Sequence, residues 1–145
     1  MALVGCKERA STAIPADPLD TVKQILSLHG VLGKRIEERS ESDRHREPDP
    51  AALAGLFADY RDTEPFLANL YVGFVTGVLA RYQENLSVTI EGARARVSAG
   101  ALDIYLRRES DKWRVLLDRS VPPEIKRRAR TARAQVLENG RISAR

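Results

Sequence analysis

The spacing of apolar residues changes once along this chain, after Asn85. Before that point apolar side chains recur every three or four positions, as along one stripe of an α-helix, and after it they alternate with polar ones, as in a half-buried β-strand. Helices followed by strands favour an α+β arrangement. We therefore predict three N-terminal helices packed on one face of a curved antiparallel three-stranded meander, with an extra basic helix at the C-terminus.

Three helices are predicted before the change in spacing. Asp17 suits the N-cap of the first, and Pro18 suits its first helical position, where the missing N–H of proline costs nothing. The third helix has an apolar surface wide enough for contacts on more than one side, so we expect it to be central. The predicted helices cover residues 19–39, 50–61 and 62–82, with a solvated polar connection at 40–49.

The meander follows after Asn85. Polar turns are expected at Glu91–Gly92 and at residues 108–112, while Gly100 interrupts the long middle strand, as at a bulge or sharp bend. Beyond Pro123 a narrow apolar stripe predicts an amphipathic helix that stops near Gly140. The predicted strands are 86–90, 95–106 and 113–117.

A length of 145 residues is that of one ordinary domain. We predict a disordered N-terminal tether over residues 1–18, one α+β domain over 19–140 and a tail over 141–145. The net charge of +4 is unevenly placed, because from Arg119 onward basic residues outnumber acidic ones by eight to two. A local excess on one terminal helix is weaker evidence for a polyanion partner than a uniformly basic surface.

Metal, cofactor and membrane-spanning functions are not predicted. One cysteine cannot form an intramolecular disulfide, and the two histidines, His29 and His45, belong to no cluster with metal-ligand spacing. The longest apolar stretch, residues 66–80, is shorter than the roughly 20 residues that a spanning helix needs. We expect that stretch to belong to the core.

The segment Leu3-Val4-Gly5-Cys6 resembles the lipobox that bacterial lipoprotein signal peptidase recognises, in which the cysteine receives the lipid. Only five residues precede Cys6, where a complete signal would carry a charged region and an apolar region. Either the signal is truncated and the domain is lipid-anchored in the cell envelope on the periplasmic side, or Cys6 is a free thiol of a cytoplasmic protein. The polar, small residues 7–18 favour the first interpretation, because they suit a tether.

The run from Ile90 to Arg128 resembles the C-terminal half of the nuclear transport factor 2-like superfamily, especially its small bacterial lipoprotein branches. The shared features are a strand entry with glycine and alanine, a long strand, a charged turn and a Lys112–Val115 strand of the Lys-Trp-Arg-Val type. The resemblance implies a cone-shaped domain whose curved sheet and long helices enclose a pocket. In that superfamily some members are isomerases or dehydratases, and many lipoprotein members have no known activity.

Four residues are candidates for lining such a pocket: His29, Tyr60, Tyr71 and Trp113. His29 is the one titratable group on an otherwise apolar helix stripe, but no acidic partner can be assigned from spacing, which favours a core histidine. Tyrosines on helix faces are usually core residues with one polar tip, and Trp113 is expected to anchor the core. We predict no catalytic residue.

The C-terminal helix carries a run of basic residues that could contact anions: Lys126, Arg127, Arg128, Arg130 and Arg133. A solvated helix face explains such a run more often than phosphate binding does. No aromatic residue is interleaved with it to stack on bases, so nucleic acid is disfavoured.

Three functions remain open from the sequence. The favoured one is a non-enzymatic cell-envelope lipoprotein domain that binds a partner protein or a small apolar ligand and meets the membrane only through a lipid on Cys6. The second is an enzyme of isomerase or dehydratase type using His29 as base. The third is a cytosolic module that binds polyanions through the C-terminal helix.

Overall fold

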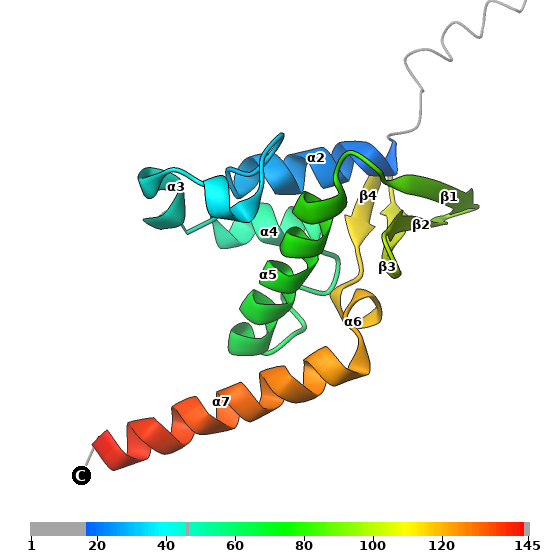
Figure 1. Cartoon of the computed structure of the whole chain (residues 1–145). Helices are drawn as coiled ribbons and strands as arrows, with labels where there is room; N and C mark the ends of the chain where they lie inside the picture. The colour runs from blue at the N-terminus through cyan, green and yellow to red at the C-terminus, as the bar shows by residue number, and fades with distance from the viewer. Residues whose placement is uncertain (1–16, 46, 144–145) are drawn as a thin grey trace, which may run out of the picture.

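The computed structural model describes residues 17–45 and 47–143. Their helices and strands follow one another in the α+β order that the spacing of apolar residues predicts (Figure 1). The helices are α2 (Pro18–Leu28), the short 3-10 helix η1 (Ile36–Glu38), α3 (Glu41–His45), α4 (Pro50–Leu56), α5 (Pro65–Tyr82), α6 (Leu117–Ser120) and α7 (Pro123–Ser143). The strands are β1 (Ser87–Glu91), β2 (Arg94–Ala99), β3 (Leu102–Glu109) and β4 (Lys112–Val115).

The sheet has four antiparallel strands in the order β1-β2-β3-β4, so the prediction of three strands is wrong. The error lies at Gly100, which does not bend one long strand but starts a tight turn between β2 and β3, with φ at +63°. A left-handed φ favours glycine, and a Cβ at this position would lie 2.7 Å from the ring of Tyr82. The turn pairs Ala99 with Leu102 and thereby fixes the register of the two strands.

The first helix is shorter than predicted, because it ends at Leu28 instead of continuing to residue 39. Gly30 has a φ of +72°, its N–H donates to the carbonyl of Ser27, and the N–H of Val31 donates to the carbonyl of Leu26. These two bonds form a Schellman motif, whose glycine stops the helix. The start of α2 agrees with the sequence, since the Asp17 carboxylate accepts the N–H of Leu19 at 2.9 Å.

Several further boundaries differ from the prediction. The connection at 40–49 contains α3, and the helix predicted over 50–61 ends at Leu56 because Phe57 and Ala58 leave it to pair with β4. The strand predicted over 113–117 ends at Val115, where the chain turns into α6. The third and last predicted helices are present as α5 and α7, although α5 begins at Pro65 and α7 continues past Gly140.

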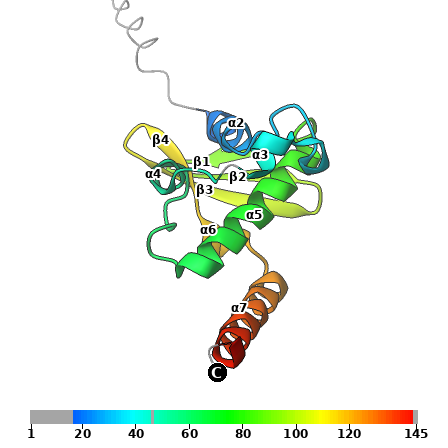
Figure 2. The same cartoon turned by 90° about the vertical axis from the view of Figure 1, so that its left-hand side faces the viewer.

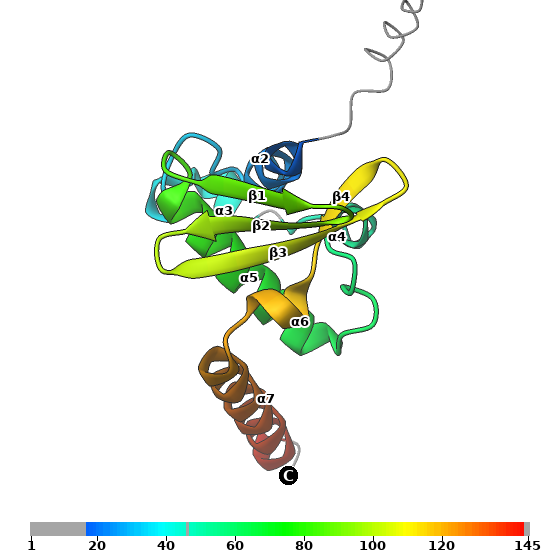
Figure 3. The same ribbon diagram turned by 90° about the vertical axis from the view of Figure 1, so that its right-hand side faces the viewer.

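The helices cover one face of the sheet, and the other face carries no helix over β1, β2 and β3 (Figures 2 and 3). The covered face is apolar and packs against α2, α4 and α5 through Val97, Ile104, Leu106, Trp113 and Val115. Trp113 is 1% exposed, and its carbonyl accepts the hydroxyl of Thr21 from α2 at 2.7 Å. The core therefore lies between the sheet and the helices, and the opposite face of the sheet is polar.

Candidate anion-binding site

The uncovered face of the sheet, called the open face from here on, is rich in arginine. Along each strand the side chains alternate between the two faces, so the residues next to the buried Ala95, Val97, Ile104 and Leu106 point away from the core. The charged members of the open face are Glu91, Arg94, Arg96, Asp103, Arg107, Glu109, Lys112 and Arg114. Positive charge exceeds negative charge among them.

Three arginines stand side by side across the open face. The register pairs Arg94 with Arg107 and Arg107 with Arg114, which places three guanidinium groups on neighbouring strands β2, β3 and β4. Like charges directly opposite each other weaken a sheet. Glu109 relieves part of the repulsion, because it accepts a hydrogen bond from Nε of Arg107 at 2.8 Å and lies 3.1 Å from Nη1 of Arg114.

A second row on the open face forms the floor of a cleft. Thr89, Arg96 and Tyr105 are paired across β1, β2 and β3. The guanidinium carbon of Arg119, on α6, lies 4.5 Å from the centroid of the Tyr105 ring, which is a cation–π contact. Together they border an open cleft of about 230 Å³, whose polar lining is Thr89, Glu91, Arg94, Arg96, Tyr105 and Arg119.

Two arginines of this cleft have their full hydrogen-bonding capacity available. Among residues 17–45 and 47–143, the side chains of Arg94 and Arg96 have no ion-pair or hydrogen-bond partner, although Glu91 stands opposite Arg94 in the register. A guanidinium group presents a planar fork of donors that fits a carboxylate or a phosphate with two parallel hydrogen bonds. The cleft is therefore suited to an anionic group.

The position of Arg119 depends on residues far away in the sequence. Leu116, the N-cap of α6, provides no capping side chain, and Asp59 supplies the cap instead by accepting the N–H of Leu117 at 2.8 Å and that of Asp118 at 2.9 Å. Ser120 accepts the N–H of Tyr105 at 2.9 Å. These bonds hold α6 beside β3, so that Arg119 reaches the ring of Tyr105.

None of the candidate pocket residues from the sequence lines the cleft on the open face. Tyr71 and Trp113 are 4% and 1% exposed and belong to the core cluster. The hydroxyl of Tyr60 donates to Oδ1 of Asn69 at 3.2 Å at the surface between α4 and α5. The open-face arginines and Asp59 were missed, although the alternation Arg94-Ala95-Arg96-Val97 already indicates that two arginines share the face opposite the core.

His29 lies at the C-cap of α2 and is partly buried. Its Nδ1 is 2.9 Å from the carbonyl oxygen of Ile25, so the neutral ring donates its Nδ1 proton there. Burial lowers the pKa of the imidazole below its usual value, and Arg39 acts in the same direction, whereas the bond to Ile25 opposes them. His29 is outside the cleft on the open face.

The basic run on α7 is largely engaged with acidic residues. Nζ of Lys126 lies 2.8 Å from Asp118, Nη2 of Arg128 lies 3.1 Å from Glu124, and Nε of Arg133 donates to Oε1 of Glu64 at 3.0 Å. Arg127 and Arg130 are exposed and have no ion-pair partner among the residues that the structure describes. Three of the five cations are thus paired with acidic residues, and two are not.

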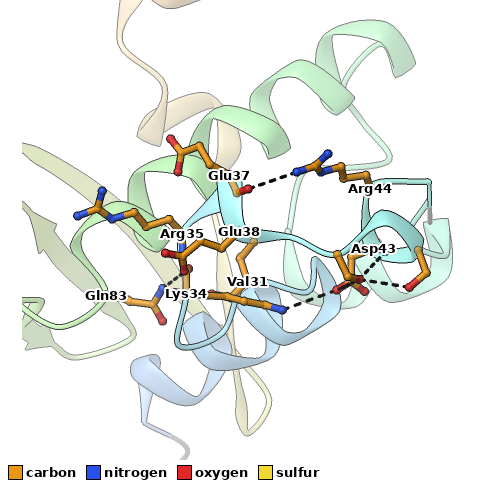
Figure 4. A network of polar contacts seen from close by, with 10 residues as sticks. Val31, Lys34, Arg35, Glu37, Glu38, Asp43, Arg44 and Gln83 are labelled. Carbon is orange, nitrogen blue, oxygen red and sulfur yellow. Dashed lines mark hydrogen bonds and ion pairs between the residues drawn. The ribbon is translucent and has the colours of Figure 1, made fainter.

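A separate network of polar contacts joins the loop after α2 to the end of α5 (Figure 4). Nε2 of Gln83 lies 3.1 Å from the carbonyl of Val31 and 3.0 Å from that of Lys34, and its Oε1 accepts the N–H of Gly33 at 2.7 Å. Nearby, Nζ of Lys34 lies 3.9 Å from Asp43. Because the side-chain amide of Gln83 is hydrogen-bonded to backbone groups, it fixes the loop and has little hydrogen-bonding capacity left for a ligand.

Within the described part of the chain no helix is both long and apolar enough to cross a membrane. The same residues contain no group of three or more histidine, cysteine, aspartate or glutamate side chains that could hold a metal ion. Cys6 and the rest of residues 1–16 lie outside the described residues. Comparison with protein-family models, curated proteins and solved structures found no match.

Proposed function

We propose that this chain is a binding domain and that it docks an acidic segment of a partner protein on the open face of its sheet. The observation that carries the proposal is the register that lines up Arg94, Arg107 and Arg114 on three adjacent strands. A fold that keeps like charges opposite each other gives up some stability, and an anionic partner would recover it.

An acidic polypeptide suits the open face better than a nucleic acid does. Glu91, Asp103 and Glu109 are interspersed with the arginines and would repel a phosphate backbone, whereas the flexible side chains of an acidic polypeptide can turn their carboxylates toward the arginines. Bases bind single-stranded sites by stacking on aromatic rings, and Tyr105 already has Arg119 over its ring. The cleft then serves as the anchor for one carboxylate, with Arg94 and Arg96 as its donors.

Binding of a fluorescent poly-glutamate peptide to the full chain tests this proposal by fluorescence anisotropy. The double variant Arg94→Gln/Arg96→Gln should bind at least about tenfold more weakly, which corresponds to about 1.4 kcal/mol. The matched control Arg127→Gln/Arg130→Gln removes the same charge from α7 and should change the dissociation constant by less than about twofold.

Three outcomes would contradict the proposal. Equal losses in both variants would mean that the peptide responds only to net charge. If the unmodified chain did not bind the peptide, the proposed docking site would be ruled out. A single-stranded oligonucleotide that binds more tightly than the peptide at the same salt concentration would assign the face to nucleic acid.

We further propose that a lipid on Cys6 holds this binding domain at the cell envelope, on the periplasmic side. The support is the sequence Leu3-Val4-Gly5-Cys6 and the polar segment that follows it. Metabolic labelling of the natural full-length protein with palmitate should mark the protein and should fail for Cys6→Ala. Absence of label in both would leave a cytoplasmic binding domain with an unmodified thiol.

A further inference from the structure

The fold treats the two outer edges of its sheet differently. The edge of β4 is covered, because Phe57 forms a parallel bridge with Val115 and the N–H of Ala58 donates to the Val115 carbonyl at 2.8 Å. The part of β3 beyond β4 is covered as well, since the N–H of Leu116 donates to the Tyr105 carbonyl at 2.8 Å. Among the described residues, nothing pairs with the outer edge of β1 (Figure 3).

The sequence of β1 lacks most of the devices that usually protect an edge strand. Its five residues, Ser-Val-Thr-Ile-Glu, contain no lysine and no proline, and its pairing with β2 runs without a bulge from Ser87 to Glu91. Ile90 is 54% exposed, more than any other exposed large apolar residue of the described chain. A regular edge that is rich in β-branched residues and carries an exposed isoleucine is a template for another strand.

We propose that β1 pairs in antiparallel fashion with β1 of a second copy of this chain, with the two-fold axis at Thr89. This register is self-complementary, because Val88 of one copy stands opposite the partner's Ile90 and both lie on the same face. The threonines at the axis also form a favourable cross-strand pair. The exposed side chain of Ile90 is covered on dimerisation.

The charges of β1 are compatible with this register. Glu91 is the one charged residue of the strand, and it stands at the strand end, opposite the partner's Ser87. The two glutamates are then separated by four residues along the strand direction, about 13 Å at the rise of an antiparallel strand. That distance exceeds the screening length of about 8–10 Å in physiological salt, so repulsion between them is weak.

The backbone groups of β1 that hydrogen-bond to β2 are different from those that would hydrogen-bond to the partner copy. In a hairpin with a two-residue turn the closing residues, here Glu91 and Arg94, bond to each other. Alternation along the strand then directs the N–H and C=O groups of Val88 and Ile90 away from the sheet. These outward groups meet in the proposed register, which completes a continuous sheet through both copies.

Cysteine cross-linking of the full chain tests the register, with Cys6→Ala as the background. Thr89→Cys places the two thiols opposite each other on the axis, where a non-hydrogen-bonded pair brings the Cα atoms to about 4.5 Å, and a disulfide-linked dimer is expected under mild oxidation. Ser87→Cys is the control, since it lies on the same open face but stands opposite the partner's Glu91. It should give at least about tenfold less dimer.

Sedimentation equilibrium of the Cys6→Ala chain under reducing conditions provides the second measurement. A dimer that becomes a monomer in Ile90→Lys is expected, because the lysines of the two copies would lie diagonally across the axis at an apolar contact. A monomer together with no cross-link at residue 89 would overturn the proposal, and so would equal cross-linking at 87 and 89. The test needs no ligand, so it stands or fails separately from the docking of an acidic partner.

Discussion

Two regions of this molecule are rich in arginine, and they differ in how the chain disposes of the charge. On α7 the cations belong to one helix, and three of the five candidates lie beside three different acidic residues at 2.8–3.1 Å. On the open face, strand pairing forces Arg94, Arg107 and Arg114 into one row, in which Arg107 and Arg114 share the single partner Glu109. Two arginines of each region, Arg94 and Arg96 here and Arg127 and Arg130 on α7, have no acidic partner among the described residues.

The difference shows that a count of charges is a poor guide to an anion-binding surface. The C-terminal helix has the denser basic run in the sequence, yet three of its cations form ion pairs near the surface. Exposed ion pairs contribute little to stability. The open face has fewer consecutive basic residues, but the alternation of side chains and the register of the strands bring its arginines together. Geometry, rather than density along the chain, concentrates positive potential.

The largest expected effect that separates the two regions concerns α6. Asp59→Ala removes the cap of α6, so the free energy of unfolding should fall by about 1–2 kcal/mol in urea denaturation. The same variant should weaken binding of the poly-glutamate peptide, because Arg119 loses its fixed position over Tyr105.

The control is Asp62→Ala, a change at an exposed aspartate on the same loop, which should stay within about 0.5 kcal/mol of the unmodified chain. Equal stability of the Asp59→Ala and Asp62→Ala variants would show that α6 does not depend on this cap.

Replacing an arginine by threonine is expected to change the free energy of unfolding by a smaller amount, with opposite signs in the two regions. Arg107→Thr removes the middle charge of the row and introduces a residue that favours strands, so it should raise the free energy of unfolding by about 0.5 kcal/mol. Arg130→Thr on α7 should lower it by about 0.5 kcal/mol, because threonine is a poorer helix former. Urea denaturation compares them, and a loss of stability in Arg107→Thr would disprove the repulsion within the row.

The smallest expected effect concerns the attachment of α7 to α5. The N–H groups of Phe66 and Leu67, together with Arg133, hold the pKa of Glu64 below its ordinary value of 4.5. A carboxyl whose pKa is lower in the folded chain stabilises the fold above the unfolded pKa and loses that contribution as pH falls through the folded pKa. The difference in Tm between the unmodified chain and Glu64→Gln should therefore be present at neutral pH and shrink below pH 4.5.

For that last comparison, Glu84→Gln is the control, since Glu84 is exposed and lies at the other end of α5. A difference in Tm for Glu64→Gln that is constant from neutral to acid pH would mean that the carboxylate form of Glu64 is not what the fold prefers.

The change from a 3.6-residue to a two-residue period was sufficient to predict an α+β fold, because each period reflects which side chains one element can bury. It was not sufficient at Gly100 or Gly30, where one glycine fits both a bend within an element and the end of that element. Only contacts decide, such as the ring of Tyr82 against Gly100. For this reason the sequence wrongly predicted that the first helix continues past Gly30 and that one strand continues through Gly100.

The candidate site depended on the same distinction. With β2 and β3 taken as one strand, Arg94 and Arg107 have no defined relation, and only the turn at Gly100 places them opposite each other. The capping of α6 by Asp59 could not be predicted either, because the two are 58 residues apart in the sequence and share no local pattern. Periodicity identifies elements, whereas the site depends on how the elements are paired.

Mapping the peptide contact by NMR tests the central claim most directly. The isotope-labelled full chain is titrated with poly-glutamate peptide, and the amide shifts of the two arginine-rich regions are compared. The largest shifts are expected on Thr89, Arg96, Tyr105 and Arg119, with small shifts on α7. Largest shifts at Arg127 and Arg130, or shifts spread evenly over both regions, would contradict it.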